Sequence, residues 1–140
     1  MVVKSRLIKA YNKIKQGKKK KRVLIIDDDS MSIKILTKCL HEIYDIVAKS
    51  DGNEAMDYLH NNTNPDIIIL DIEMPNMNGR VFLKHIKCYP EVNKIPIIVV
   101  TSVENKTMKS SLEKLGIASY IIKPVHKVNF LDDIKKVLAA

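Results

Sequence analysis

Short apolar runs that alternate with amphipathic stretches constrain the fold of this 140-residue chain more than any other feature. The runs are VLII (23–26), YDIVAK (44–49), DIIIL (66–70), IPIIVV (95–100) and SYIIK (119–123). The most apolar of them are rich in β-branched residues, which is typical of strands covered on both faces of a parallel sheet. The stretches between and after them carry apolar residues at helical spacing, as in the stripe formed by Met31, Ile33, Ile35, Leu36, Leu40 and Ile43. The pattern predicts a single α/β domain with a five-stranded parallel sheet and helices on both faces.

Polar residues that suit a reactive site follow four of these runs. Asp27 and Asp28 follow the first run, Asp71 the third, Thr101 the fourth and Lys123 the fifth. In open parallel sheets, ligands bind outside the carboxyl ends of the strands, so we expect these side chains to meet at one edge. Neighbouring carboxylates about 4 Å apart repel by about 4 kcal/mol at an effective dielectric near 20. We therefore expect a turn, a helix cap or a bound cation to compensate for this repulsion.

Four sequence motifs occur in order over residues 22 to 138: VLIIDDDS, DIIILDIEMPNMNG, IPIIVVTS and SYIIKP. In this order and spacing they resemble the receiver domain of two-component response regulators. The resemblance implies a CheY-like sheet with strand order 2-1-3-4-5. It also implies a phosphoacceptor that catalyses only its own phosphorylation and dephosphorylation, and is a signalling protein rather than an enzyme.

The resemblance assigns roles to the residues at the strand ends. Asp71 would accept the phosphoryl group, and Asp28 would bind Mg²⁺ directly, with Mn²⁺ as an alternative ion. Asp27 would act largely through an ordered water, and the backbone carbonyl of Glu73 would be a further ligand. Oxygen ligands and retained waters suit Mg²⁺. For Asp29, a helix N-cap or a solvated residue is the better interpretation.

Three further residues would respond to phosphorylation. Lys123 would contact a phosphoryl oxygen, and Thr101 would hydrogen-bond the phosphoryl group. The resemblance implies that Thr101 then vacates space for an aromatic side chain on the last strand, which is Tyr120 here. We therefore expect Thr101 and Tyr120 to form the switch, although a static half-buried tyrosine is the simpler interpretation of Tyr120 alone.

The family also implies partners. The phosphoryl donor would be a sensor histidine kinase or a histidine phosphotransfer protein, and the effector is not identified by the sequence. By the same analogy, the face built from 105–138 would support a homodimer.

One alternative places the chain in another class. Asp27-x-Asp29 after an apolar run resembles the first motif of haloacid-dehalogenase-type phosphatases, with Asp27 as nucleophile and Asp29 as general acid. The later acids Asp132 and Asp133 fall in a helical pattern instead of after a strand, and the motif DIEMPNMNG would have no role.

The charge of the chain is divided between two parts. Residues 1–22 hold ten basic and no acidic residues, whereas the rest holds 14 basic and 16 acidic residues. We therefore expect a basic N-terminal arm over 1–21 and a receiver domain over 22–140. A tail or interdomain segment is the favoured interpretation of the arm, with a partner-binding helix or a basic surface anchor as alternatives. The arm matches no DNA-binding motif, so nucleic-acid binding is not supported.

The two cysteines, Cys39 and Cys88, form neither a CxxC motif nor a metal-like cluster. They predict buried, reduced thiols, which fits a cytoplasmic protein.

Overall fold

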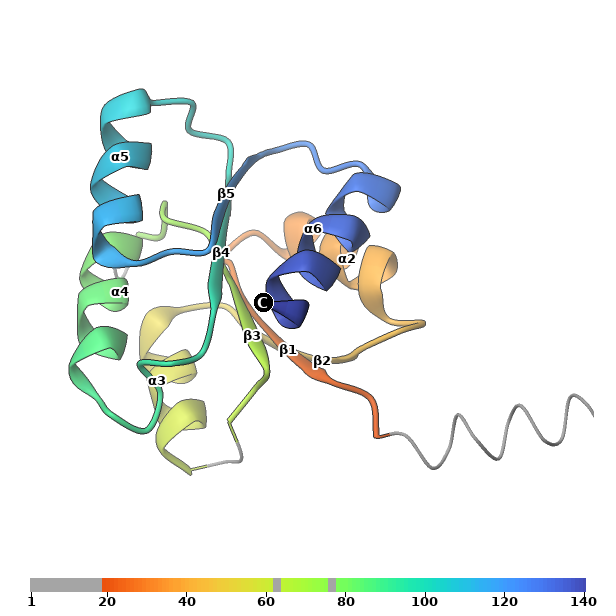
Figure 1. Cartoon of the computed structure of the whole chain (residues 1–140), viewed down its shortest axis with the longest axis horizontal. Helices are drawn as coiled ribbons and strands as arrows, with labels where there is room; N and C mark the ends of the chain where they lie inside the picture. Colours follow the sequence, from red (N-terminus) through yellow and green to blue (C-terminus); the bar gives the residue numbers. More distant parts are fainter. Residues whose placement is uncertain (1–18, 62–63, 76–77) are drawn as a thin grey trace, which may run out of the picture.

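The computed structural model describes residues 19–61, 64–75 and 78–140. Over these residues the chain forms a five-stranded parallel sheet with helices on both faces, as the sequence predicts (Figure 1). The strands are β1 (Arg22–Ile26), β2 (Asp45–Lys49), β3 (Ile67–Leu70), β4 (Ile97–Thr101) and β5 (Ser119–Ile122). Their order in the sheet is β2-β1-β3-β4-β5, which confirms the predicted order.

The first four helices connect consecutive strands, the last follows β5, and together they cover the two faces unequally. They are α2 (Ser30–Leu40), α3 (Gly52–Asn61), α4 (Gly79–Cys88), α5 (Lys106–Leu115) and α6 (Lys127–Ala139). Figure 1 shows α3, α4 and α5 on one side of the sheet, and α2 and α6 on the other. The strand order reverses beside β1, so the loops after β1 and β3 flank a switch point, where sheets of this kind hold their ligands.

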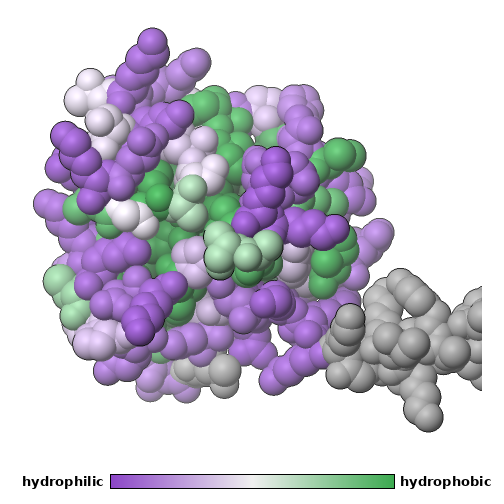
Figure 2. Space-filling view, viewed as in Figure 1, coloured by the Kyte–Doolittle hydropathy of each residue, from purple (hydrophilic) through white to green (hydrophobic). Residues whose placement is uncertain are grey.

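The central strands carry the core because both of their faces are covered. Residues Val23–Ile26, Ile67–Leu70 and Ile97–Val100 are all at most 1% exposed. Phe82 of α4 packs in the cluster on one face of the sheet, and Phe130 of α6 in the cluster on the other. The outer strands β2 and β5 are only half-buried or exposed. Figure 2 shows hydrophobic residues reaching the surface between the two helical layers, framed by hydrophilic ones.

One expectation about burial is wrong, and a second holds only in part. Cys39 is half-buried and Cys88 is exposed, and both are free thiols. On α2 and just after it, the predicted apolar stripe is only partly used, because Leu36 and Leu40 are buried while Met31, Ile35 and Ile43 are about half exposed or more. The helices α2 and α6 share this face of the sheet, and part of the apolar surface of α2 stays in solvent.

None of the helices over the described residues is both long and apolar enough to cross a membrane. The predicted arm over 1–21 lies almost entirely outside the described residues. Of it, only Lys19, Lys20 and Lys21 are described, and all three are exposed.

Candidate functional site

The site lies at the carboxyl ends of β1 and β3, where the predicted acids meet. Asp27 directly follows β1 and is 1% exposed, and Asp71 directly follows β3 and is 7% exposed. Asp28 is exposed beside them. One carboxylate oxygen from each of the three lies within 4.8 Å of the others. The sheet brings them together because β1 and β3 are neighbours in parallel register, Ile26 beside Leu70.

The two buried carboxylates also hold the turns that carry them. Asp27 Oδ1 accepts a hydrogen bond from the Asp29 N–H at 2.9 Å, and Asp71 Oδ1 accepts one from the Glu73 N–H at 3.0 Å. Each aspartate therefore presents one oxygen to its own turn and the other, Oδ2, to the site. The hydrogen bonds to Oδ1 therefore fix both side chains and leave both Oδ2 atoms for contacts within the site.

Lys123 reaches across from the end of β5 and joins the two buried acids. Its Nζ donates to Asp27 Oδ2 at 2.8 Å and to Asp71 Oδ2 at 3.1 Å. The adjoining Lys123–Pro124 peptide bond is cis. One ammonium thus serves two buried carboxylates, while the predicted contact of Lys123 with a phosphoryl oxygen stays a prediction.

The charges of this group are reflected in its pKa values. Burial raises the pKa of Asp27, and its hydrogen bonds from Lys123 and the Asp29 N–H offset this only in part. Burial alone would lower the pKa of Lys123, but its hydrogen bonds to Asp27 and Asp71 outweigh that effect and raise it. The lysine is therefore held in its charged form, while Asp27 still lacks full compensation for its charge.

Thr101 and Tyr120 are linked through the backbone of a residue that the sequence did not single out. The Val103 N–H donates to Thr101 Oγ1 at 3.3 Å, and Tyr120 Oη donates to the Val103 carbonyl at 2.5 Å. Thr101 is fully buried, and Tyr120 is half-buried. Burial, followed by the charges of Glu73 and Asp71, raises the pKa of Tyr120, so its hydroxyl keeps its proton. No side-chain pattern could have indicated Val103, because only its backbone takes part.

Gly79 packs closely against the backbone that directly follows Asp71. The Gly79 N–H donates to the Ile72 carbonyl at 3.1 Å, and a Cβ at Gly79 would overlap the Ile72 backbone and lie 3.0 Å from the Asp71 carbonyl. Asn78 caps α4 by accepting from the Arg80 N–H. The Glu73 side chain is exposed, and the role of its carbonyl as a ligand stays a prediction.

Asp29 does not belong to the acidic cluster. It is the N-cap of α2, and its Oδ1 accepts from the Met31 N–H at 3.0 Å, which confirms the N-cap interpretation. The hydrogen bonds from the Met31 N–H and the Ser32 hydroxyl lower the pKa of Asp29. Its Oδ2 accepts from Ser32, whose hydroxyl also contacts Lys123. Sequence reasoning missed Ser32, because its contact with Lys123 joins segments far apart in the sequence.

The donor set fits a hard divalent cation. Three carboxylates with oxygens close together, two of them buried, favour oxygen-preferring ions such as Mg²⁺ or Mn²⁺.

The fold and this site together define a receiver domain. The family model described as "Response regulator receiver domain" matches residues 23–135. The chain therefore belongs to the response regulator receiver domain family.

Two curated relatives differ in how much of them the chain covers. The chain is 30% identical over 119 residues to the "Polar-differentiation response regulator DivK" of Brucella ovis, covering 84% of this chain and 96% of that protein. It is 36% identical over 104 residues to the "Sensor histidine kinase CheAY" of Helicobacter pylori, covering 73% of this chain. That match spans only 13% of the kinase.

Solved structures agree with the fold. A CheY-like receiver domain protein from Methanospirillum hungatei is 28% identical with a TM-score of 0.77, covering 86% of this chain and 95% of that one. The Mn²⁺-bound form of the response regulator Rcp1 is 25% identical with a TM-score of 0.70, covering 85% and 90%.

The phosphatase alternative gains no support from this site. Asp27 would have to be its nucleophile, yet that carboxylate is only 1% exposed. Asp29, the general acid of that scheme, caps a helix instead, and Asp132 and Asp133 lie within α6.

Proposed function

We propose that this receiver domain accepts a phosphoryl group on Asp71, in a reaction that depends on a divalent cation. The observation that supports this most is the contact of Asp71 Oδ2 with Lys123, within a cluster of acids that fits a cation. Asp71 is less deeply buried than Asp27, at 7% against 1% exposed, and it follows β3, the central strand of the sheet. Its carboxylate is the nucleophile, and its bond to Glu73 N–H holds it in one orientation.

Phosphoryl transfer requires positioning and neutralisation of charge more than it requires proton transfer. Mg²⁺, or Mn²⁺ in its place, would be held by Asp27, Asp28, Asp71 and the Glu73 carbonyl, and would supply charge neutralisation on the phosphoryl oxygens. The Lys123 ammonium would contact another phosphoryl oxygen. Thr101 would donate its hydroxyl to the phosphoryl group once Asp71 is modified.

The same modification would operate a switch. When Thr101 turns towards the phosphoryl group, its hydroxyl is lost as the acceptor for Val103 N–H, and the loop that also holds Tyr120 is freed to move. The affected surface is the face built from 105–138, which contains α5, β5 and α6. This face is where we place effector binding and, by family analogy, a homodimer.

The donor would be a sensor histidine kinase or a histidine phosphotransfer protein, which carries the group on an imidazole. DivK, a response regulator, supports this proposal as a relative matched over nearly its whole length. Because such donors are charged from ATP, we place the chain in the cytoplasm. The basic arm over 1–21 would be a tail or interdomain segment preceding the receiver domain over 22–140, with no proposed role in nucleic-acid binding.

One experiment tests the assignment of Asp71. The full chain is incubated with Mg²⁺ and acetyl phosphate, the acyl phosphate is trapped with borohydride, and the modified peptide is located by mass spectrometry. We expect the modification at Asp71, and its loss in Asp71→Asn but not in the control Asp57→Asn on the exposed surface of α3.

The other outcomes are equally decisive. Modification at Asp27 would revive the phosphatase scheme. An Asp71 that stays unmodified whether or not Mg²⁺ is present would overturn the proposed function.

A further inference from the structure

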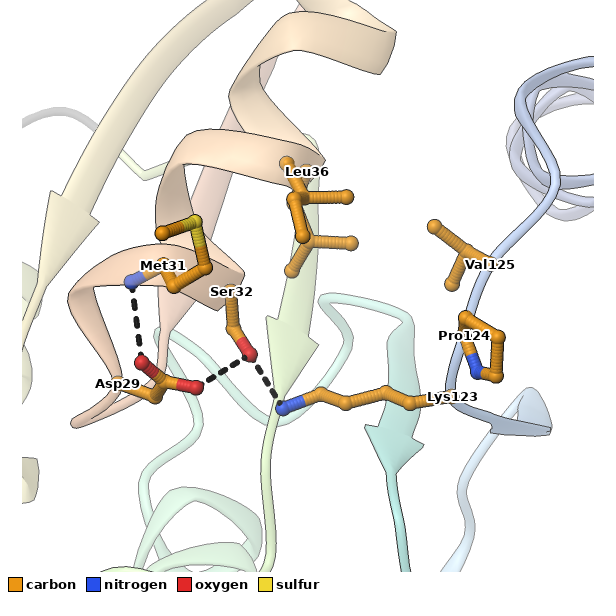
Figure 3. A pocket seen from close by; sticks show the side chains of 8 residues that line it. Asp29, Met31, Ser32, Leu36, Lys123, Pro124 and Val125 are labelled. Carbon is orange, nitrogen blue, oxygen red and sulfur yellow. Dashed lines mark hydrogen bonds between the residues drawn. The ribbon is translucent and has the colours of Figure 1, made fainter.

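A groove of about 300 Å³ lies between α2 and the segment that follows β5. Its walls are apolar, with Leu36, Pro124 and Val125 among them, but its floor is polar (Figure 3). Lys123 points from the end of β5 into this floor towards Ser32 of α2. The polar contact joins two segments 91 residues apart in the sequence.

The Lys123 ammonium has three N–H groups, and three acceptors surround it. Two are the carboxylates of Asp27 and Asp71, and the third is Ser32 Oγ at 3.0 Å. The carboxylates are the groups that the proposed chemistry uses. Ser32 is thus the one acceptor among the three that neither receives the phosphoryl group nor belongs to the acidic cluster.

The Ser32 hydroxyl is itself held in place. It donates to Asp29 Oδ2 at 3.1 Å, while Asp29 Oδ1 accepts from the Met31 N–H. A serine hydroxyl has one hydrogen, and with that hydrogen on Asp29 its lone pairs face the ammonium. The N-cap of α2 therefore orients Ser32, and Ser32 in turn orients Lys123.

We propose that Ser32 is a positioning residue for phosphoryl transfer, which keeps the Lys123 ammonium at the phosphoryl site independently of the carboxylates. This inference rests on the proposed function. A lysine side chain is flexible, and its ammonium behaves as a point charge without fixed geometry. When Asp71 becomes an acyl phosphate, the ammonium exchanges its contact with the Asp71 carboxylate for a contact with a phosphoryl oxygen. Ser32 remains, since phosphorylation does not alter it.

The reaction itself requires nothing covalent from Ser32. With acetyl phosphate, an Asp71 carboxylate oxygen forms the new bond to phosphorus as the bond from phosphorus to the acetate oxygen breaks. Acetate leaves with that electron pair, and no proton moves from Ser32 or Lys123. The expected contribution of Ser32 is therefore to the rate of transfer, with little effect on how tightly the donor binds.

The test compares variants that differ in the hydroxyl at this position. Ser32→Thr and Ser32→Val have nearly the same shape, and only the first keeps a hydroxyl; Ser32→Ala removes it without adding bulk. Ser110→Ala, on the exposed surface of α5, is the control. Initial rates of Asp71 phosphorylation are measured over a range of acetyl phosphate concentrations at saturating Mg²⁺.

We expect Ser32→Ala and Ser32→Val to lower the maximal rate by about tenfold, the effect of losing one hydrogen bond to a charged group. The half-saturating donor concentration should change by less than about twofold, and Ser32→Thr should keep most of the wild-type rate. The Lys123 ammonium signal in ¹H–¹⁵N spectra should be sharp in wild type and Ser32→Thr, and broadened in the other two.

Two results would overturn this inference alone: wild-type maximal rates in both Ser32→Ala and Ser32→Val, or equal losses in Ser32→Thr and Ser32→Val. The second result would mean that shape, and not the hydroxyl, matters at this position. A wild-type chain that is not modified at Asp71 would overturn the proposed function first, and the inference with it.

Discussion

Individual residues at the site divide the tasks of holding and reacting. Asp27 and Asp71 each give one oxygen to a backbone N–H and the other to Lys123. A buried carboxylate without hydrogen bonds would cost several kcal/mol, so these contacts are what make two adjacent buried acids tolerable. Asp28 remains exposed to solvent, where its charge costs less. The site therefore keeps one accessible carboxylate beside two fixed ones.

The close packing at Gly79 predicts that adding a single methyl group there destabilises the fold. A Cβ there would overlap the Ile72 backbone, which directly follows Asp71 and cannot rotate away as a side chain would. We expect Gly79→Ala to destabilise the fold by about 3 kcal/mol and to displace the Asp71 turn. The free energy of unfolding from urea titration and the initial rate of acetyl phosphate labelling should both fall.

Gly116 provides the matched control. It ends α5 in the left-handed region at φ 98°, and a Cβ there would make only ordinary contacts with the Lys87 side chain at 3.5 Å. Gly116→Ala should cost about 1 kcal/mol of stability through backbone strain and leave the labelling rate unchanged. Equal labelling rates in both variants would show that the Ile72 contact does not position Asp71.

The elements were predictable to the extent that their burial leaves a pattern in the sequence. β1, β3 and β4 are covered on both faces, and their unbroken apolar runs predicted the sheet. Once the strands were assigned, the sequence alone predicted that one edge of the sheet carries Asp27, Asp71, Thr101 and Lys123. The α2 stripe was less informative, because apolar spacing does not show that Met31 and Ile35 stay exposed.

Contacts made through the backbone, or between distant segments, left no such pattern. The Val103 backbone joins Thr101 to Tyr120, yet any residue at that position could supply its N–H and carbonyl. Ser32 meets Lys123 only because α2 and the end of β5 lie side by side in the folded chain. Side-chain chemistry therefore predicted which polar side chains meet at the sheet edge, but not the groups that orient them.

The link through Val103 predicts how the face built from 105–138 responds to phosphorylation. In wild type, beryllofluoride, a mimic of the aspartyl phosphate, should shift the Tyr120 ring signals and the backbone amides of α5 and α6. Tyr120→Phe lacks the hydroxyl that contacts the Val103 carbonyl. It should keep the rate of acetyl phosphate labelling within about twofold, because Tyr120 touches no reacting atom, but lose most of the amide shifts on this face.

The control for that variant is Tyr89→Phe, at an exposed position after α4, which should behave as wild type. The switch would be contradicted if beryllofluoride binding to wild type changed neither the Tyr120 ring signals nor the amide signals of the face built from 105–138. Shifts of full size in Tyr120→Phe would instead show that the hydroxyl does not carry the coupling.

At the scale of the whole molecule, the apolar clusters stabilise the fold, whereas the acids at the sheet edge destabilise it. Two apolar clusters, one on each face of the sheet, hold the strands together. The acids at the strand ends add repulsion that Lys123 offsets only in part. Stability and cation binding are therefore linked, since an ion that binds only the folded chain stabilises it by mass action.

This linkage predicts opposite effects of Asp28→Asn with and without Mg²⁺. In EDTA the variant should be at least as stable as wild type, because one of three neighbouring negative charges is removed. In Mg²⁺ at 100 times its dissociation constant, wild type should gain about 2.7 kcal/mol and the variant much less. Urea midpoints followed by circular dichroism measure both. Asp57→Asn, outside the cluster, should keep the wild-type response to Mg²⁺. If Asp28→Asn gained as much stability from Mg²⁺ as wild type, Asp28 would not be a ligand, and the cation would have to be held without it.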